Sequence, residues 1–149
     1  MNIADYLKTV NKRYQNGISR EHSYRADLEQ LIRSLVPDVE VTNEPANVTD
    51  CGNPDYVISN KKIPIGYIEA KDVGKDLNSK SYKEQFTRYK NALDNLIITD
   101  YVWFQLHHSC TLYVHHPLHQ LYKYLQILML RILATFCIAI WLSATYDYQ

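Results

Sequence analysis

The chain has 149 residues, which is enough for one domain with a hydrophobic core and too few for two domains of ordinary size. Its 16 lysine and arginine residues balance 16 aspartate and glutamate residues, so the net charge favours no class of partner. Three cysteines without paired spacing, Cys51, Cys110 and Cys137, exclude a disulfide framework and indicate a reducing compartment. The first 17 residues contain no long apolar run, so we expect no signal peptide and a cytoplasmic location.

Charged residues are distributed unevenly along the chain. Residues 1–105 hold 29 of the 32 charged side chains, whereas the remaining residues hold five of the six histidines and no glycine. So sharp a change in composition predicts a boundary near Leu106. We therefore expect a folded domain over residues 1–106 and a tail of different character over residues 107–149.

The first predicted helix lies in the sequence SREHSYRADLEQLIRSLVP, which starts at Ser19. Ser19 is a suitable N-cap, apolar side chains recur at helical spacing, and Pro37 follows the end of the helix. The alternating sequence DVEVTNE then predicts a short strand. Two β-rich runs, DYVIS and IPIGYIEAK, are joined by Asn60, Lys61 and Lys62 and predict a hairpin.

A second helix is predicted in SYKEQFTRYKNALDNL, where Ser81 and Glu84 have the spacing of a capping box. The run LIITDYVWFQL, residues 96–106, predicts a final strand. The predicted order is therefore α-β-β-β-α-β. This order favours an α/β sandwich in which helices flank a mixed central sheet.

Charged side chains stand at the ends of the two hairpin strands. Glu69 and Lys71 are two residues apart and share a face of their strand. Asp55 joins that face if the hairpin loop has three residues; with a two-residue loop, a β-bulge must intervene. Two carboxylates without histidine or cysteine suit a hard cation such as Mg²⁺. The plainer alternative is an exposed strand end and a turn aspartate.

Four motifs in order along the chain resemble those of the PD-(D/E)XK nuclease superfamily. Pro54-Asp55 matches "PD", Glu69-Ala70-Lys71 matches "ExK", and both lie on the predicted hairpin. The sequence QFTRY, residues 85–89, resembles the QxxxY element of some branches, and Glu21 lies in the first helix, where many members carry an additional acid. The short sequences EHSYR, GNPDY, IEAKD and TDYVWFQL are most similar to those in the N-terminal cleavage domain of single-chain (type IIG-like) restriction–modification enzymes. The resemblance covers residues 1–106.

This resemblance implies a restriction-endonuclease-like fold and a set of site residues. Asp55 and Glu69 would bind Mg²⁺, for which Mn²⁺ can substitute, and Lys71 would be the catalytic lysine. Glu21 would be an accessory acid, although a carboxylate at a helix start is also favoured by the helix dipole alone. Gln85 and Tyr89 lie on one helical side and would orient the lysine or touch a phosphate. Core packing is the alternative role for Tyr89.

Basic side chains indicate a polyanionic partner, and double-stranded DNA is the partner that the resemblance implies. Solvated helix faces have a similar composition, so the basic residues are weak evidence when taken alone. A methyltransferase or specificity component, or a second copy of the chain, is a further expected partner. The two basic groups are Lys75, Lys80, Lys83, Arg88 and Lys90, and Lys8, Lys12, Arg13, Arg20 and Arg25.

The tail has three possible explanations. A reading-frame shift or gene truncation would append an unselected sequence to a nuclease domain, and the near absence of acids favours this explanation. The mostly apolar run Leu125 to Leu142 has 18 residues and is just long enough to span a membrane, although Arg131 lies within it. The third explanation is a helix packed on the domain.

We therefore expect a Mg²⁺-dependent DNA endonuclease domain that hydrolyses phosphodiester bonds, as a fragment of a restriction–modification enzyme. One alternative is a DNA-binding remnant that keeps the fold and does not cut. The other is a small membrane-anchored protein whose folded part has a structural role. Metal-dependent cleavage separates the first two hypotheses, and membrane fractionation tests the third.

Overall fold

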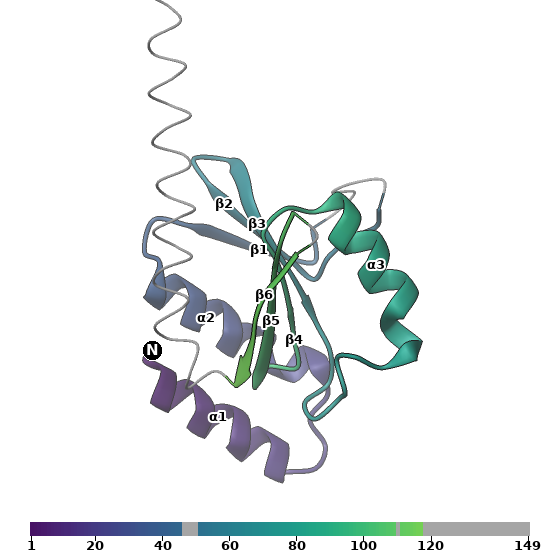
Figure 1. Cartoon of the computed structure of the whole chain (residues 1–149). Coiled ribbons are helices and arrows are strands. Elements are labelled where there is room, and N and C mark those ends of the chain that lie inside the picture. Colours follow the sequence, from purple (N-terminus) through teal and green to yellow (C-terminus); the bar gives the residue numbers. More distant parts are fainter. Residues whose placement is uncertain (46–50, 110, 118–149) are drawn as a thin grey trace, which may run out of the picture.

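The computed structural model describes residues 1–45, 51–109 and 111–117, and these form a single sheet with helices on both sides (Figure 1). The predictions for residues 118–149, including that for the apolar run Leu125 to Leu142, lie outside the described residues. The elements in chain order are α1 (Ile3–Gln15), the 3₁₀ turn η1 (Glu21–Tyr24), α2 (Arg25–Leu35), β1 (Glu40–Asn43), β2 (Tyr56–Asn60), β3 (Ile63–Ala70), the 3₁₀ turn η2 (Lys80–Tyr82), α3 (Lys83–Ala92), β4 (Leu96–Thr99), β5 (Trp103–His108) and β6 (Thr111–Pro117).

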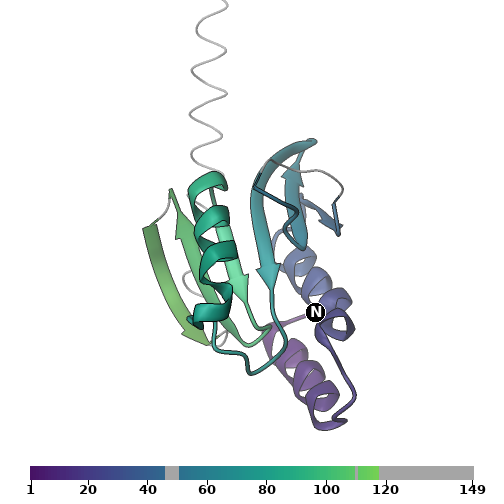
Figure 2. The ribbon, with the colours of Figure 1, turned by 90° about the vertical axis from the view of Figure 1, so that its right-hand side faces the viewer.

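In the described part of the chain the sheet has six strands in the order β1-β2-β3-β4-β5-β6. Neighbouring strands are antiparallel except β3 and β4, which are parallel because α3 connects them. Helices α1 and α2 cover one face and α3 covers the other (Figure 2). The predicted α/β class with a mixed central sheet flanked by helices is confirmed.

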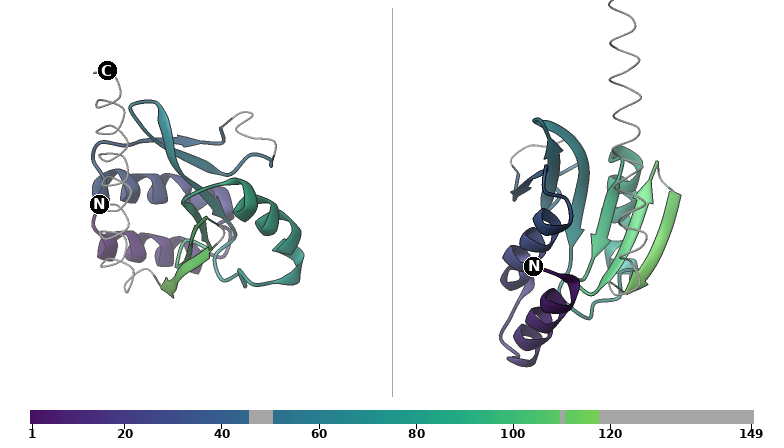
Figure 3. Two further views of the ribbon diagram at one scale, coloured as in Figure 1. Left: turned by 45° about the horizontal axis from the view of Figure 1, so that its top comes forward. Right: turned by 90° about the vertical axis from the view of Figure 1, so that its left-hand side faces the viewer.

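Alternating strand residues supply two separate cores. On β4, Ile97 packs with α1 and α2, whereas Leu96 and Ile98 pack with α3. Figure 3 shows from two further sides that α1 and α2 lie together on one face. Because both faces of the sheet are buried under helices, the successive residues Leu96 to Ile98 of the central strand β4 are all apolar.

Helix α1 was not predicted from the sequence. Asn2 caps it by accepting a hydrogen bond from the Asp5 backbone N–H at 2.8 Å, and Tyr6 and Val10 are its buried side chains. So narrow an apolar stripe among charged residues gives a weak periodic signal. The predicted helix from Ser19 instead begins as η1 and becomes a regular α-helix only at Arg25.

The run predicted as one strand over residues 96–106 is two antiparallel strands, β4 and β5. Asp100 makes the turn between them, since its Oδ1 accepts hydrogen bonds from the backbone N–H groups of Val102 and Trp103. Tyr101 has a φ of 70°. An aspartate whose side chain accepts a hydrogen bond from the backbone N–H two residues later favours a turn. The sequence pattern did not predict this turn because apolar residues lie on both sides of it.

Strand β6 continues the sheet beyond Leu106, where the composition changes. Its backbone pairs with the whole of β5, from Trp103 opposite Pro117 to His108 opposite Thr111. Any shortened chain that keeps all six strands must therefore extend at least to Pro117. Within the described ranges, no helix combines the length and the apolar character needed to cross a membrane.

The β2–β3 hairpin has a two-residue loop, so the three-residue loop is wrong and the β-bulge is the alternative that holds. Asn60 pairs with Ile63, and Lys61 and Lys62 form the turn with positive φ angles of 48° and 68°. The register shifts between Ile58 and Ser59. Because one extra residue in β3 reverses the alternation, the bulge lets the residue before β2 face the same way as Glu69.

Candidate functional site

Three of the predicted site residues meet at the end of β3. Asp55 directly precedes β2, Glu69 is the last residue but one of β3, and Lys71 directly follows the strand. Asp55 Oδ2 accepts a hydrogen bond of 2.8 Å from the backbone N–H of Ala70, between the other two residues. The structure therefore brings Asp55, Glu69 and Lys71 together.

The Glu69 carboxylate is buried, with 3 % of the residue exposed. Its Oε1 accepts hydrogen bonds from Lys71 Nζ at 2.6 Å and from Gln85 Nε2 at 2.8 Å. Burial raises the pKa of Glu69 to about 7, and the nearby negative charge of Asp55 acts in the same direction, against the opposing effect of Lys71. This carboxyl is thus poised between its neutral and ionised forms near neutral pH.

Lys71 is held as a cation against two aromatic rings. Its Nζ lies 5.3 Å from the centroid of the Tyr82 ring and 5.7 Å from that of Phe86. Burial favours a lower pKa for Lys71, but the hydrogen bond to Glu69 and the negative charges of Glu69, Asp55 and Glu21 together outweigh it, so the pKa is raised above its usual value. Lys71 is therefore suited to stabilising negative charge, and in this arrangement it has no tendency to act as a base.

Glu21 reaches the site through an arginine that sequence analysis had placed only in a basic group. Arg25 Nη2 donates to Glu21 Oε1 at 3.0 Å and to Asp55 Oδ1 at 2.6 Å, while Nη1 donates to Glu44 Oε1 and, at 3.3 Å, to Asn43 Oδ1. Arg25 is 7 % exposed. The four-residue spacing of Glu21 and Arg25 was the one signal in the sequence that could have shown part of this cluster.

Gln85 and Tyr89 lie side by side on α3 and hold different parts of the site. Gln85 binds the Glu69 carboxylate, as described, and does not orient the lysine directly. The Tyr89 hydroxyl donates to the backbone carbonyl of Asn53 at 2.9 Å, and Arg88 Nε donates to the carbonyl of Cys51 at 2.7 Å. Tyr89 is also a core residue, 3 % exposed. Helix α3 thus fixes Glu69 and the segment that leads into Asp55.

Replacing Tyr89 with phenylalanine removes this hydroxyl alone and leaves the core volume unchanged. We expect the free energy of unfolding to fall by about 1 kcal/mol, the usual net contribution of one hydrogen bond. Urea unfolding of both proteins measures the change. Tyr14→Phe is the matched control, because Tyr14 is 55 % exposed and should change stability by less than about 0.5 kcal/mol. Equal stability of wild type and Tyr89→Phe would show that the Asn53 contact does not hold this segment.

The donor set fits a hard divalent cation. Asp55 and Glu69 are acceptor-only oxygen ligands when ionised. Each Asp55 oxygen accepts one of the hydrogen bonds described and keeps a second lone pair, whereas Glu69 Oε1 already accepts two, so Glu69 would bind a cation through Oε2. The effect of Asp55 on the pKa of Glu69 shows two negative charges that repel each other, a repulsion that a cation between them would relieve. No group of three or more histidine, cysteine or acidic residues forms a metal site in the described part of the chain. Water would complete the coordination, as is usual for Mg²⁺.

Some of the basic residues are exposed, and others are held in ion pairs with acids of the same chain. Lys75, Lys80, Lys83 and Arg88 are exposed on α3 and the segment before it. The group at the N-terminus is smaller than predicted. Arg13 is paired with Asp27 at 2.6 Å, and Arg25 is buried among acids. Exposed positive charge therefore remains in both groups. Lys75, Lys80, Lys83 and Arg88 lie on and before α3, the helix that contacts Glu69, and Lys8, Lys12 and Arg20 lie near the N-terminus.

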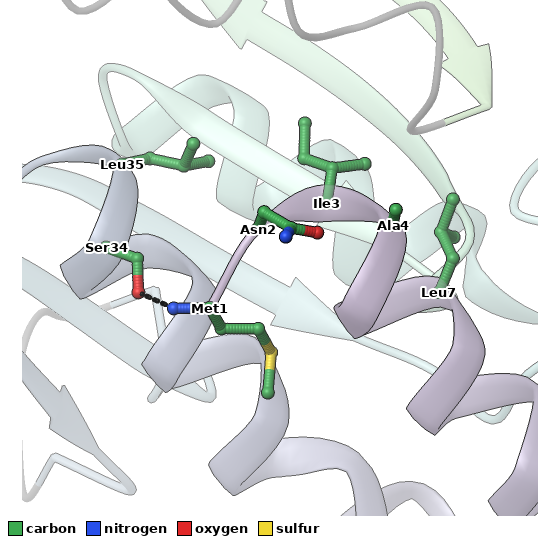
Figure 4. Close-up of a pocket in the computed structure, with 7 residues that line it drawn as sticks. All are labelled: Met1, Asn2, Ile3, Ala4, Leu7, Ser34 and Leu35. Atoms are coloured by element: carbon green, nitrogen blue, oxygen red, sulfur yellow. Dashed lines mark hydrogen bonds between the residues drawn. The ribbon is translucent and has the colours of Figure 1, made fainter.

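A hollow of about 650 Å³ lies elsewhere, between the start of α1 and the end of α2 (Figure 4). The Met1 amino group donates to Ser34 Oγ at 2.7 Å on its wall. Most of its lining is apolar, and it contains none of the carboxylates or lysines described above. Its lining residues are Met1, Asn2, Ile3, Ala4, Leu7, Ser34 and Leu35.

The fold is similar to part of a solved structure. The cryoEM structure of the DrdV–DNA complex matches 76 % of this chain with a TM-score of 0.62 and 21 % sequence identity. The match covers 12 % of the DrdV chain, so this chain corresponds to a small part of that protein. No protein-family model and no curated protein matches the chain.

Proposed function

We propose that this chain carries a divalent-cation-dependent DNA endonuclease site of the PD-(D/E)XK kind, which hydrolyses phosphodiester bonds. The observation that carries the proposal is the meeting of Asp55, Glu69 and Lys71 at the end of β3, on the bulged hairpin. The likeness in fold to DrdV, whose structure was solved with DNA, supports a DNA substrate. The order of the four motifs and the short sequences around them support the finer assignment to the cleavage domain of a restriction–modification enzyme.

Asp55 and Glu69 would hold the cation, which when bound supplies Lewis acidity to a phosphate oxygen and lowers the pKa of a bound water. Lys71 carries a positive charge beside Glu69 and can hold a phosphate oxygen or a water by hydrogen bonds. Gln85 fixes the Glu69 carboxylate through its amide N–H. Gln85 and Lys71 both donate to Oε1 of Glu69, which leaves Oε2 for another ligand.

The exposed lysines near α3 would attract the phosphate backbone without selecting a base sequence. Lys83 lies on α3, the helix that contacts Glu69, and Lys75 and Lys80 lie in the segment before it, which supports a DNA-binding surface near the proposed site. Binding should therefore weaken steeply as salt increases.

A second candidate is a protein that binds DNA and does not cut it. The observation in its favour is that Arg25 and Lys71 form ion pairs with Asp55 and Glu69. A cation would then have to compete with two fixed positive charges. Activity with metal decides between the two candidates.

The test uses the full chain and supercoiled plasmid DNA, with Mg²⁺ or Mn²⁺ and with excess chelator. We expect nicked or linear products only with metal, because the carboxylates act through the cation. Asp55→Asn should abolish cleavage and leave DNA affinity within a few-fold of wild type. Equal cleavage in chelator would refute the mechanism. DNA binding without cleavage under any metal condition would favour the second candidate.

A further inference from the structure

Arg25 is the first residue of α2, and its guanidinium joins acids from three separate places in the chain. Its Nη2 contacts Glu21 of η1 and Asp55 directly before β2, and its Nη1 contacts Glu44 directly after β1. The Tyr56 hydroxyl donates to the Arg25 carbonyl at 3.3 Å, which fixes the backbone as well. The arginine is thus held at both its main chain and its head group.

A single nitrogen of Arg25 is shared by two carboxylate oxygens. The distances from Nη2 are 3.0 Å to Glu21 Oε1 and 2.6 Å to Asp55 Oδ1. If Arg25 did not fill this position, two carboxylates that converge there would attract a metal cation. The guanidinium is always protonated and donates in a fixed planar geometry, so its charge at this point is permanent.

We propose that Arg25 is a positioning residue which fills a second cation position between Glu21 and Asp55, so that the site recruits one divalent cation and not two. The proposal rests on the proposed function, in which Asp55 and Glu69 share that one cation. It also changes the expected role of Glu21. This acid holds Arg25 in place, and it is not a metal ligand in the wild-type protein.

The consequence for Asp55 is a fixed carboxylate. Oδ1 is bound by Arg25 and Oδ2 by the Ala70 backbone N–H, so the plane of the carboxylate is set from both ends. Without Arg25, the acids Glu21, Glu44 and Asp55 would remain close together with no cation among them. A divalent ion entering there would draw Asp55 away from the ion shared with Glu69.

The experiment counts tightly bound Mn²⁺ on the full chain by calorimetry and by the electron paramagnetic resonance signal of free Mn²⁺. Wild type should bind one ion. Arg25→Gln should bind a second ion while cleaving plasmid DNA at least tenfold more slowly. Arg25→Lys keeps a positive charge at the position and should bind one ion. The double variant of Arg25→Gln with Glu21→Gln removes one of the two acids and should return to one ion.

Circular dichroism and thermal melts establish that each variant is folded. Two tightly bound ions on wild type would overturn the proposal even if Arg25→Gln cannot be purified. So would a folded Arg25→Gln that binds a single ion, and in that case the proposed function would stand. A wild-type protein that binds no Mn²⁺ and never cleaves would instead refute the proposed function itself.

Discussion

Replacing Lys71 with methionine should lower the metal-dependent cleavage rate by about a hundred- to a thousandfold, the loss seen when one preorganised charge-stabilising donor is removed from an active site. Methionine keeps the apolar part of the side chain against Tyr82 and Phe86 and removes only the ammonium. The loss should fall on the maximal rate, since in the proposed function the exposed basic residues, and not the half-buried Lys71, would attract the DNA backbone. Plasmid cleavage at saturating Mg²⁺ and DNA titration of the same protein measure the two effects.

Lys62→Met is the matched control for Lys71→Met. Lys62 is exposed in the hairpin loop, so its loss removes the same charge without touching Glu69. We expect its cleavage rate to stay within a few-fold of wild type. A Lys71→Met protein that cleaves as fast as Lys62→Met would remove Lys71 from the mechanism.

Stability of the metal-free protein should fall as pH rises from about 4.5 to about 7, because of Glu69. Burial and the charge of Asp55 raise the pKa of this carboxyl in the folded protein, so the folded state binds more protons than the unfolded state across this range. The free energy of unfolding therefore decreases with pH there. The contribution of Glu69 is on the order of 3 kcal/mol, and the stabilisation is fully present only below the unfolded pKa.

A divalent cation should reverse this trend. The cation binds the ionised carboxylate, so its stabilising effect should grow as pH rises through about 7. Urea unfolding at several pH values, with chelator and with Mg²⁺, measures both slopes. Glu69→Gln should remove the two effects together.

Glu40→Gln controls for the lost negative charge, since Glu40 is an exposed residue of β1. It should follow the wild-type curves. If Glu69→Gln retains the wild-type pH dependence in chelator, the buried carboxyl does not titrate as proposed. If Mg²⁺ stabilises wild type equally at low and high pH, the cation does not bind through Glu69.

The part of the site that the sequence predicted depends on local geometry. Glu69 and Lys71 share a face because they are two residues apart on a strand, which needs no knowledge of the fold. The position of Asp55 needed one further condition, an odd loop or a bulge, and the bulge in β3 opposite Ile58 and Ser59 supplies it. Strand and helix patterns around these residues were also sufficient to predict the α/β class.

Contacts between distant segments were not predictable in the same way. Glu21 and Arg25 are neighbours on one helical turn, but Glu44 and Asp55 meet Arg25 only after β1 and β2 have packed against α2. An arginine in a basic stretch has the same appearance in the sequence whether it is buried or solvated. The turn at Asp100 was missed for a related reason, since its hydrogen bonds compete with an apolar pattern that continues on both sides.

The most direct measurement of the central claim is anomalous diffraction from crystals of the full chain soaked in Mn²⁺. The predicted result is one strong peak bound by carboxylate oxygens of both Asp55 and Glu69, absent from crystals of Asp55→Asn. Water molecules should complete its coordination, with Lys71 still beside Glu69. No peak at saturating Mn²⁺, or a peak held only by acids other than these two, would contradict the account.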